Sequence, residues 1–217
     1  MSANRVLTLR EWQNVVKDPF DLIVQASTTD SQDRWQPFPI GMQYNYVNFC
    51  HELELQKGTH DNLALLAISA TNDRRRRPEG LNRMQIVETC LQLGFVNQTM
   101  SPQEYFTCLP SYKFVISPEG NGIDCHRHYE ALLAGCIPIV EYHPGIVEKY
   151  RGCPVLYTRD YSELTPEYLE QTYANMLNET YDFSRLFLSH YSQETQEYIK
   201  YCGNYWMIRC TQSPFYN

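Results

Sequence analysis

The segment from Lys113 to Val140 holds the residues whose types and spacing are best suited to chemistry. It reads as an apolar run, a loop with two glycines, a polar helix start and a second apolar run. Glycines in such a loop let the backbone approach a ligand closely. We expect Asp124 to cap the helix, whose free N–H groups would favour a phosphate. The predicted loop consists of Gly120, Asn121, Gly122, Ile123 and Asp124.

Arg127 and Glu130 follow this loop and are three positions apart, so a helix places them on one face. A guanidinium in the first turn can donate charge-assisted hydrogen bonds to a diphosphate. Glu130, one turn deeper, can accept hydrogen bonds from two ribose hydroxyls. The alternative is a salt bridge on a solvated surface, worth about 0.2–0.5 kcal/mol. The adjacent glycine loop favours the nucleotide interpretation.

His126 and His128 flank Arg127 and raise the question of a metal site. Residues two apart on a helix point away from each other, so this pair cannot chelate as an i,i+4 pair can. We therefore predict no metal site. His126 is expected near the phosphate or the sugar, and His128 on the surface or in packing.

The elements around this segment alternate between apolar runs and helical patterns. The expected strands are Asn62–Ala70, Phe95–Val96, Lys113–Ser117, Cys136–Glu141 and Cys153–Tyr157. The expected helices are Leu81–Leu93, Ser101–Pro110 with its Ser-Pro-x-Glu start, Asp124–Ala134 closed by Gly135, one from Pro144, and Thr165–Leu177. This alternation predicts an α/β fold with a Rossmann-like, doubly wound parallel sheet.

We expect residues 1–217 to form a single nucleotide-sugar-binding α/β domain. Its core would be residues 61–180. Residues 1–60 would be an N-terminal extension, in which Phe20–Gln25 could form a strand. Residues 181–217 would be a C-terminal segment, helical over 183–211.

Composition excludes some classes of protein. The formal net charge of −7 argues against nucleic-acid binding. No apolar run approaches the roughly 20 residues that span a bilayer, and the N-terminus lacks a signal-peptide core. None of the eight cysteines forms a C-x-x-C pair, and several lie in apolar runs, which favours a reducing, cytoplasmic location. The sequons at Asn97 and Asn178 are counter-evidence, and the Golgi or ER lumen is the alternative if a signal or anchor was removed.

The pattern K-F-x-x-x-P-x-G-N-G-x-D-x-H-R-x-x-E-A-L-x-x-G-C-I-P-I-V resembles the C-terminal, donor-binding domain of GT-B-type glycosyltransferases, and most closely the exostosin-like group. The close match covers about thirty residues, and the order of strands and helices extends it over Asn62–Leu177. The resemblance implies that Glu130 binds ribose, that Arg127 binds and stabilises the departing diphosphate, and that Gly120–Asp124 shape the donor loop.

In such domains the loop after the first strand also faces the donor. Here it contains Asn72 and the run Arg74–Arg77, with Arg83 at the start of the next helix. Cations there would offset the charge of a leaving nucleoside diphosphate, as metal ions do in other transferases. The transfer would then need no metal or cofactor besides the UDP- or GDP-sugar donor. A solvated loop or a nuclear-import-like patch is the other interpretation of the arginine run.

The resemblance covers only the donor half of a GT-B enzyme, because residues 1–60 are too few for an acceptor domain. Three arrangements remain open: a separately expressed domain, a subunit that pairs with an acceptor-binding partner, or a compact one-domain transferase. The acceptor would be a glycan or a protein. A non-catalytic nucleotide-sugar-binding module, or another nucleotide-dependent enzyme, is the alternative to a transferase.

Overall fold

The computed structural model describes residues 5–15, 17–30, 35–50, 58–70 and 82–217. Its strands are β1 (Val6–Thr8), β2 (Asn62–Leu65), β3 (Tyr112–Ile116), β4 (Ile137–Glu141), β5 (Leu156–Thr158) and β6 (Thr180–Asp182). Its α-helices are α1 (Leu9–Trp12), α2 (Tyr44–Cys50), α3 (Arg83–Gln92), α4 (Pro102–Cys108), α5 (His126–Leu133), α6 (Pro144–Lys149), α7 (Pro166–Met176) and α8 (Gln193–Thr211). Short 3-10 turns cover Pro19–Asp21, Leu109–Ser111, Tyr161–Glu163, Ser184–Leu186 and Leu188–His190.

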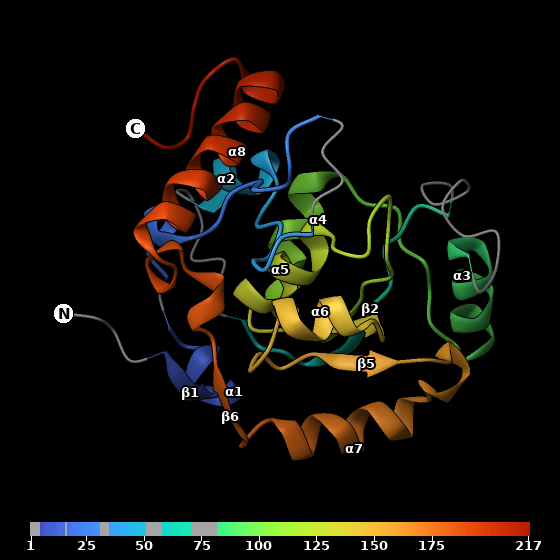
Figure 1. The fold of residues 1–217 in the computed structure, drawn as a ribbon. Coiled ribbons are helices and arrows are strands. Elements are labelled where there is room, and N and C mark those ends of the chain that lie inside the picture. Colours follow the sequence, from blue (N-terminus) through green and yellow to red (C-terminus); the bar gives the residue numbers. More distant parts are fainter. Residues whose placement is uncertain (1–4, 16, 31–34, 51–57, 71–81) are drawn as a thin grey trace.

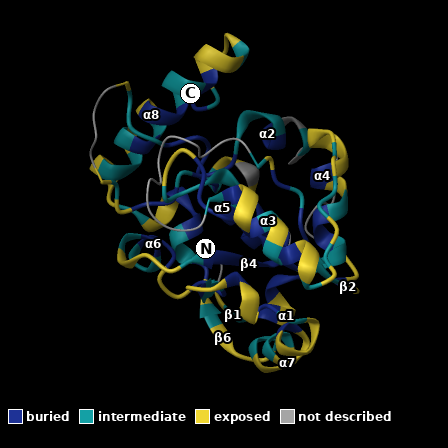
Figure 2. Ribbon diagram, turned by 90° about the vertical axis from the view of Figure 1, so that its right-hand side faces the viewer, coloured by how far each residue is buried: buried dark blue, intermediate teal, exposed yellow. Residues whose placement is uncertain are grey.

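Four parallel strands form the main sheet, in the order β2-β3-β4-β5. Helices α5 and α6 lie on one face of this sheet and α7 on the other (Figures 1 and 2). Phe114, Val115 and Ile116 of the central strand β3 are at most 1% exposed, as continuous apolar runs in a covered parallel sheet should be. The predicted α/β class with a parallel sheet is confirmed.

The helix boundaries follow local signals in the sequence. Ser101 caps α4 in a capping box with Glu104, and Pro102 occupies the first turn. Thr165 caps α7 through its side-chain oxygen alone, which accepts a hydrogen bond from Tyr168 N. Gly135 follows α5 with a φ of +77°, a left-handed conformation that glycine adopts without strain. These three predictions from the sequence are confirmed.

Strand β2 is shorter than predicted, and the expected strand Phe95–Val96 is wrong. Val96 is 69% exposed, and only a single parallel bridge joins Leu66 to Asn97. The Asn97 side chain takes over the pairing, since its Oδ1 accepts from Ile68 N at 3.0 Å and its Nδ2 donates to Ile68 O at 3.1 Å. Beside the backbone bond from Gln98 N to Leu66 O at 2.8 Å, a side-chain amide therefore extends the pairing at this edge where a second strand was expected.

Two further segments differ from expectation. The possible strand Phe20–Gln25 is a 3-10 turn followed by isolated bridges at Leu22 and Val24. The helical stretch expected over 183–211 is an α-helix only from Gln193, because two 3-10 turns precede it.

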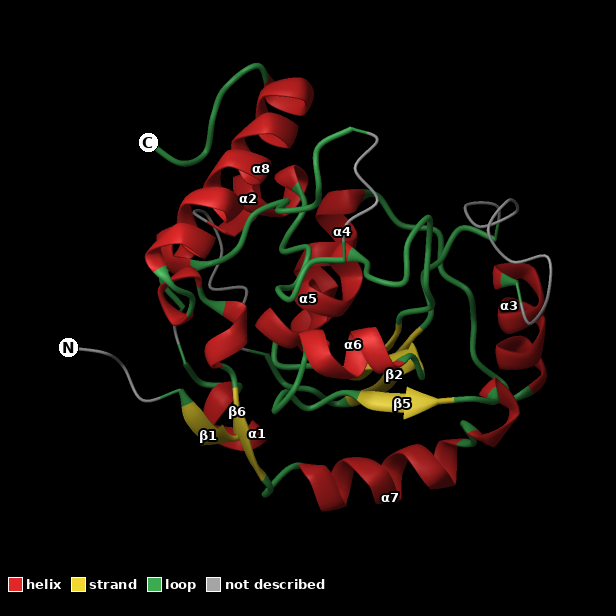
Figure 3. Cartoon of the chain, viewed as in Figure 1, coloured by secondary structure: helices red, strands yellow, loops and turns green. Residues whose placement is uncertain are grey.

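The N-terminal segment belongs to the same core as the sheet. The Trp12 ring stacks on Phe183 with centroids 3.9 Å apart, and its Nε1 donates to Leu132 O at 2.7 Å. Strand β1 pairs antiparallel with β6, so residues 6–8 lie beside residues 180–182 (Figure 3). Leu22, Ile23 and other apolar residues of this segment are also fully buried.

No helix of the described ranges is long and apolar enough to cross a membrane. Seven of the eight cysteines have described side chains, and none of these seven forms a disulfide.

Candidate functional site

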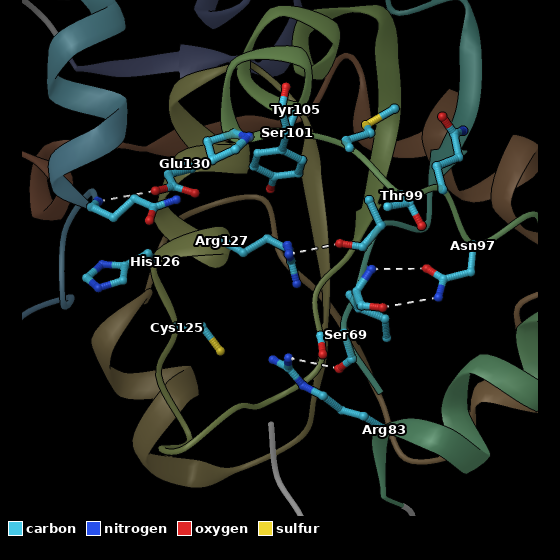
Figure 4. Close-up of a pocket in the computed structure, with 16 residues that line it drawn as sticks. Ser69, Arg83, Asn97, Thr99, Ser101, Tyr105, Cys125, His126, Arg127 and Glu130 are labelled. Atoms are coloured by element: carbon cyan, nitrogen blue, oxygen red, sulfur yellow. Dashed lines mark hydrogen bonds between the residues drawn. The ribbon is translucent and has the colours of Figure 1, made fainter. Parts of the chain in front are cut away.

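A pocket of about 650 Å³ opens where β2 ends and α5 begins. Its walls come from segments that are far apart in the sequence. They are residues 67–69 after β2, residues 97–101 before α4, Pro102 and Tyr105 on α4, and the first turns of α5. Figure 4 shows polar side chains from these segments pointing toward one another. The predicted residues Arg83, His126, Arg127 and Glu130 all line it.

Glu130 forms one wall of the pocket and is only 1% exposed. Its Oε1 accepts a hydrogen bond from the backbone N–H of Gln43 at 3.2 Å. Burial raises the pKa of Glu130 to about 7, while the Gln43 donor and the Arg127 charge act in the opposite direction. The carboxyl group therefore changes its charge near neutral pH.

Arg127 projects into the middle of the pocket (Figure 4). Its Nη2 donates to Ala67 O at 2.9 Å, and its Cζ lies 5.4 Å from the centroid of the Tyr105 ring. The buried Nε has no hydrogen-bond partner among the described residues. The guanidinium thus has donors left for a ligand.

The alternative of a solvated salt bridge between Arg127 and Glu130 is wrong. Glu130 is buried, and no ion pair within 4.0 Å joins the two described side chains. One pocket therefore presents a cation and a carboxyl group to the same volume. This pairing suits a ligand that is anionic at one end and carries hydroxyl groups at the other.

Arg83 is buried and its guanidinium joins two loops. Its Nε donates to Glu119 O at 2.8 Å and its Nη2 to Pro118 O at 3.1 Å, with Ser69 O at 3.5 Å from Nη1. These contacts connect the chain after β2 with the chain after β3. Because the N–H donors of Arg83 are directed at backbone carbonyls, Arg83 would act on a ligand mainly by electrostatic attraction.

The five residues of the predicted glycine loop do not line the pocket. Gly120 is buried, and a Cβ added to it would lie 3.1 Å from Nη2 of Arg83, whereas Asn121 and Gly122 are exposed. Ile123 is half-buried, and its carbonyl lies 3.3 Å from Nε2 of His128.

The prediction that Asp124 caps the helix is wrong. Cys125 is the N-cap of α5 and makes no side-chain capping bond, and the helix starts at His126. The Asp124 carboxylate points instead toward α6 and the N-terminal segment, where it accepts from Lys149 Nζ at 3.0 Å, Tyr150 OH at 2.8 Å and Ile40 N at 2.9 Å. A buried carboxylate gains more from a cation and a hydroxyl than from one helix end.

The two histidines have separate partners. His126 Nδ1 lies 2.8 Å from Gly41 O, and burial lowers the pKa of His126. His128 is fully buried, and its Nδ1 lies 2.6 Å from Ser117 Oγ. Burial lowers the pKa of His128 to about 4, so both rings are neutral at pH 7. The packing role foreseen for His128 matches this position.

Two predicted site residues, Asn72 and Arg74, lie outside the described residues with the rest of the run Arg74–Arg77.

Several pocket residues were not foreseen, and Gln43, Asn97 and Tyr105 are three of them. Each comes from an element that is distant in sequence from α5. The Ser-Pro-x-Glu helix start fixes where Tyr105 lies on α4, but only tertiary packing turns its ring toward Arg127.

A scan against protein-family models finds no family that matches this chain, and a search of curated proteins finds no matching relative. The fold and site define an α/β protein with a polar pocket at the carboxyl end of a parallel strand.

Proposed function

We propose that this chain binds a nucleoside-diphosphate sugar and acts as a glycosyltransferase or as the donor-binding part of one. The observation that carries the proposal is the pocket in which α5 presents Arg127 and the buried Glu130 to one volume. Arg127 would hold the diphosphate and stabilise it as it leaves, and Glu130 would accept hydrogen bonds from ribose. The resemblance of Lys113–Val140 to GT-B donor domains supports the same polarity.

The topology is also consistent with a Rossmann-like, doubly wound sheet. Strand β3 occupies one side of β2, and the parallel bridge between Leu66 and Asn97 uses the other. The chain thus runs outward from β2 to Asn97 and returns through α4 to β3. Ligands of doubly wound sheets bind at the carboxyl ends of strands where the order reverses in this way, and the pocket is at this point.

The reaction would transfer the sugar to an acceptor hydroxyl, with a general base deprotonating that hydroxyl. The positive charges of Arg127 and Arg83 would stabilise the departing diphosphate without a metal ion. An acceptor-binding domain or partner subunit would complete the site.

Thermal unfolding with UDP, GDP, UDP-glucose and GDP-mannose tests the binding step. A ligand at one hundred times its dissociation constant should stabilise the protein by about 2.7 kcal/mol. If none of the four raises the melting temperature, the proposal fails. Release of the nucleoside diphosphate from the donor, alone or with simple acceptors, then separates an enzyme from a non-catalytic binding module.

Arg127→Ala tests the assigned polarity. We expect it to weaken binding of the nucleoside diphosphates about 10- to 100-fold, because a charge-assisted hydrogen bond contributes about 1.5–3 kcal/mol, and to leave uridine or guanosine binding unchanged. Arg151→Ala is the matched control, since that side chain is 67% exposed and pairs with Glu148 on α6. Equal losses for diphosphate and nucleoside would contradict a phosphate role for Arg127.

A further inference from the structure

Few of the described groups around Glu130 stabilise its ionised form. The residue is 1% exposed, and within the described ranges one backbone N–H, from Gln43, donates to its Oε1. The nearest basic side chain on α5, Arg127, is directed at Ala67 O and the Tyr105 ring instead. The carboxyl group therefore lines the pocket and forms no ion pair with any described residue.

Burial favours the neutral form of the other titratable groups of the pocket, apart from the arginines. Burial raises the pKa of Tyr105, on α4, and raises the pKa of Cys125, at the start of α5, to about 12. Burial lowers the pKa of His126, whose ring is bonded to Gly41 O. The arginines stay protonated. Among the described residues that line the pocket, Glu130 is thus the acid whose pKa is raised to about 7.

A ligand with two vicinal hydroxyl groups would change this balance. Two O–H donors on the carboxylate form charge-assisted hydrogen bonds, which favour the ionised form of the group that accepts them. A protonated Glu130 accepts hydrogen bonds only weakly, and its own O–H needs a separate acceptor. A diol such as ribose would consequently bind the anion in preference to the acid.

We propose that nucleotide binding in this pocket is coupled to release of one proton from Glu130. This inference rests on the proposed function, because it takes the diol of the donor's ribose as the partner of the carboxyl group. Its consequence is that the pocket holds its donor tightly in a neutral or alkaline medium and loosely in an acidic one.

Isothermal titration calorimetry in two buffers of different protonation enthalpy measures the released protons directly. The probes are UDP-glucose and GDP-mannose, because their diphosphates do not titrate between pH 6 and 8, unlike the terminal phosphate of UDP or GDP. With the pKa near 7, we expect release of roughly 0.9 proton at pH 6, 0.5 at pH 7 and 0.1 at pH 8. The dissociation constant should be roughly tenfold higher at pH 6 than at pH 8.

Glu130→Gln should remove both the proton release and the pH dependence of binding. Glu104→Gln is the matched control, because this carboxylate lies on the exposed start of α4 and should leave both unchanged. The wild-type buffer comparison does not depend on either variant being folded.

The outcomes separate the two proposals. Binding without proton release, or release that persists in a folded Glu130→Gln variant, would overturn the coupling and leave the nucleotide site intact. If neither probe binds at any pH, both proposals are overturned.

Discussion

At the scale of single residues, the environment of Glu130 links the pocket to the stability of the protein. Glu130 is 1% exposed and has one described backbone donor, so its ionised form loses most of the stabilisation that water would give it. Its protonated form is therefore favoured more strongly in the folded protein than in water. Folding therefore carries a cost whenever the medium is alkaline enough to ionise the group. Ligand hydroxyls would offset that cost, so the same feature that weakens the free protein favours binding.

The first prediction concerns Glu130→Gln. Burial raises the pKa of Glu130 from 4.5 to about 7, so its contribution to stability is complete below pH 4.5 and is lost as the pH rises through 7. We expect the wild-type protein to lose about 2 kcal/mol from this group between pH 5.5 and 8, and the variant to lose none of it. Urea unfolding at both pH values measures the difference.

Glu104→Gln is the control for this measurement. Hydrogen bonds from Ser101 lower the pKa of Glu104, which therefore stays ionised from pH 5.5 to 8. Its substitution should leave the pH dependence of the unfolding free energy as in the wild type. A Glu130→Gln variant with the wild-type slope would show that Glu130 does not titrate in this range.

The sequence carried part of this residue-level information. The spacing of Arg127 and Glu130 placed both on one face of a helix, and the structure brings both into one pocket. The burial of Glu130 could not be read from the sequence, because its donor Gln43 is 87 residues away. The cap assigned to Asp124 failed for the same reason, since local spacing says nothing of Lys149 and Tyr150.

At the scale of elements, α3 holds together the loops that border the pocket. It lies beyond the carboxyl end of β5 and against the turn Tyr161–Glu163 (Figure 1). From its first residue, the Arg83 guanidinium reaches the carbonyls of Pro118 and Glu119 after β3. The helix therefore positions the chain after β3 by hydrogen bonds as well as by packing.

The second prediction concerns Arg83→Ala. The carbonyls of Pro118 and Glu119 lose their donor, as does Ser69 O at its longer distance, and we expect the free energy of unfolding to fall by about 2–3 kcal/mol. Arg83→Lys should recover only part of this, because an ammonium lacks the planar arrangement of donors that serves both carbonyls. Urea unfolding measures both variants. The exposed Arg151→Ala should change stability by no more than about 0.5 kcal/mol, and an equally small effect of Arg83→Ala would contradict the structural role.

Element boundaries with local causes were predictable, and those with tertiary causes were not. Ser101, Thr165 and Gly135 mark helix ends because caps and left-handed backbone depend on neighbouring residues. The supposed strand at Phe95–Val96 is apolar, yet the pairing beside β2 is made by the backbone of Asn97 and Gln98 and by the Asn97 side chain. Apolar runs identify candidate strands, but hydrogen-bonded pairing also depends on the neighbouring strand, which the run itself does not show.

At the scale of the whole molecule, the N-terminal segment and the sheet share one core. Trp12 is 1% exposed between Phe183 and the end of α5, and Ile23 N donates to the hydroxyl of Tyr129 at 2.8 Å. The segment also supplies Gln43 to the pocket. The sequence predicted only an N-terminal extension, because residues 1–60 lack the alternation of strands and helices. Their contribution comes from single buried side chains, which leave no periodic pattern.

The third prediction follows from this shared core. A fragment of residues 61–217 would expose the surfaces that Trp12, Leu22 and Ile23 cover, and Trp12→Ala alone should cost about 3–5 kcal/mol in the full chain. Since domains of this size have stabilities of about 5–15 kcal/mol, we expect the fragment to lack a cooperative urea transition and near-ultraviolet circular dichroism.

The free energy of unfolding of Trp12→Phe should lie between those of the wild type and Trp12→Ala, because phenylalanine keeps the ring stacking but loses the hydrogen bond to Leu132. If the fragment unfolds cooperatively, the N-terminal segment only covers a core that folds without it. Nucleotide binding to that fragment would then test whether Gln43 is needed to hold Glu130 in the pocket.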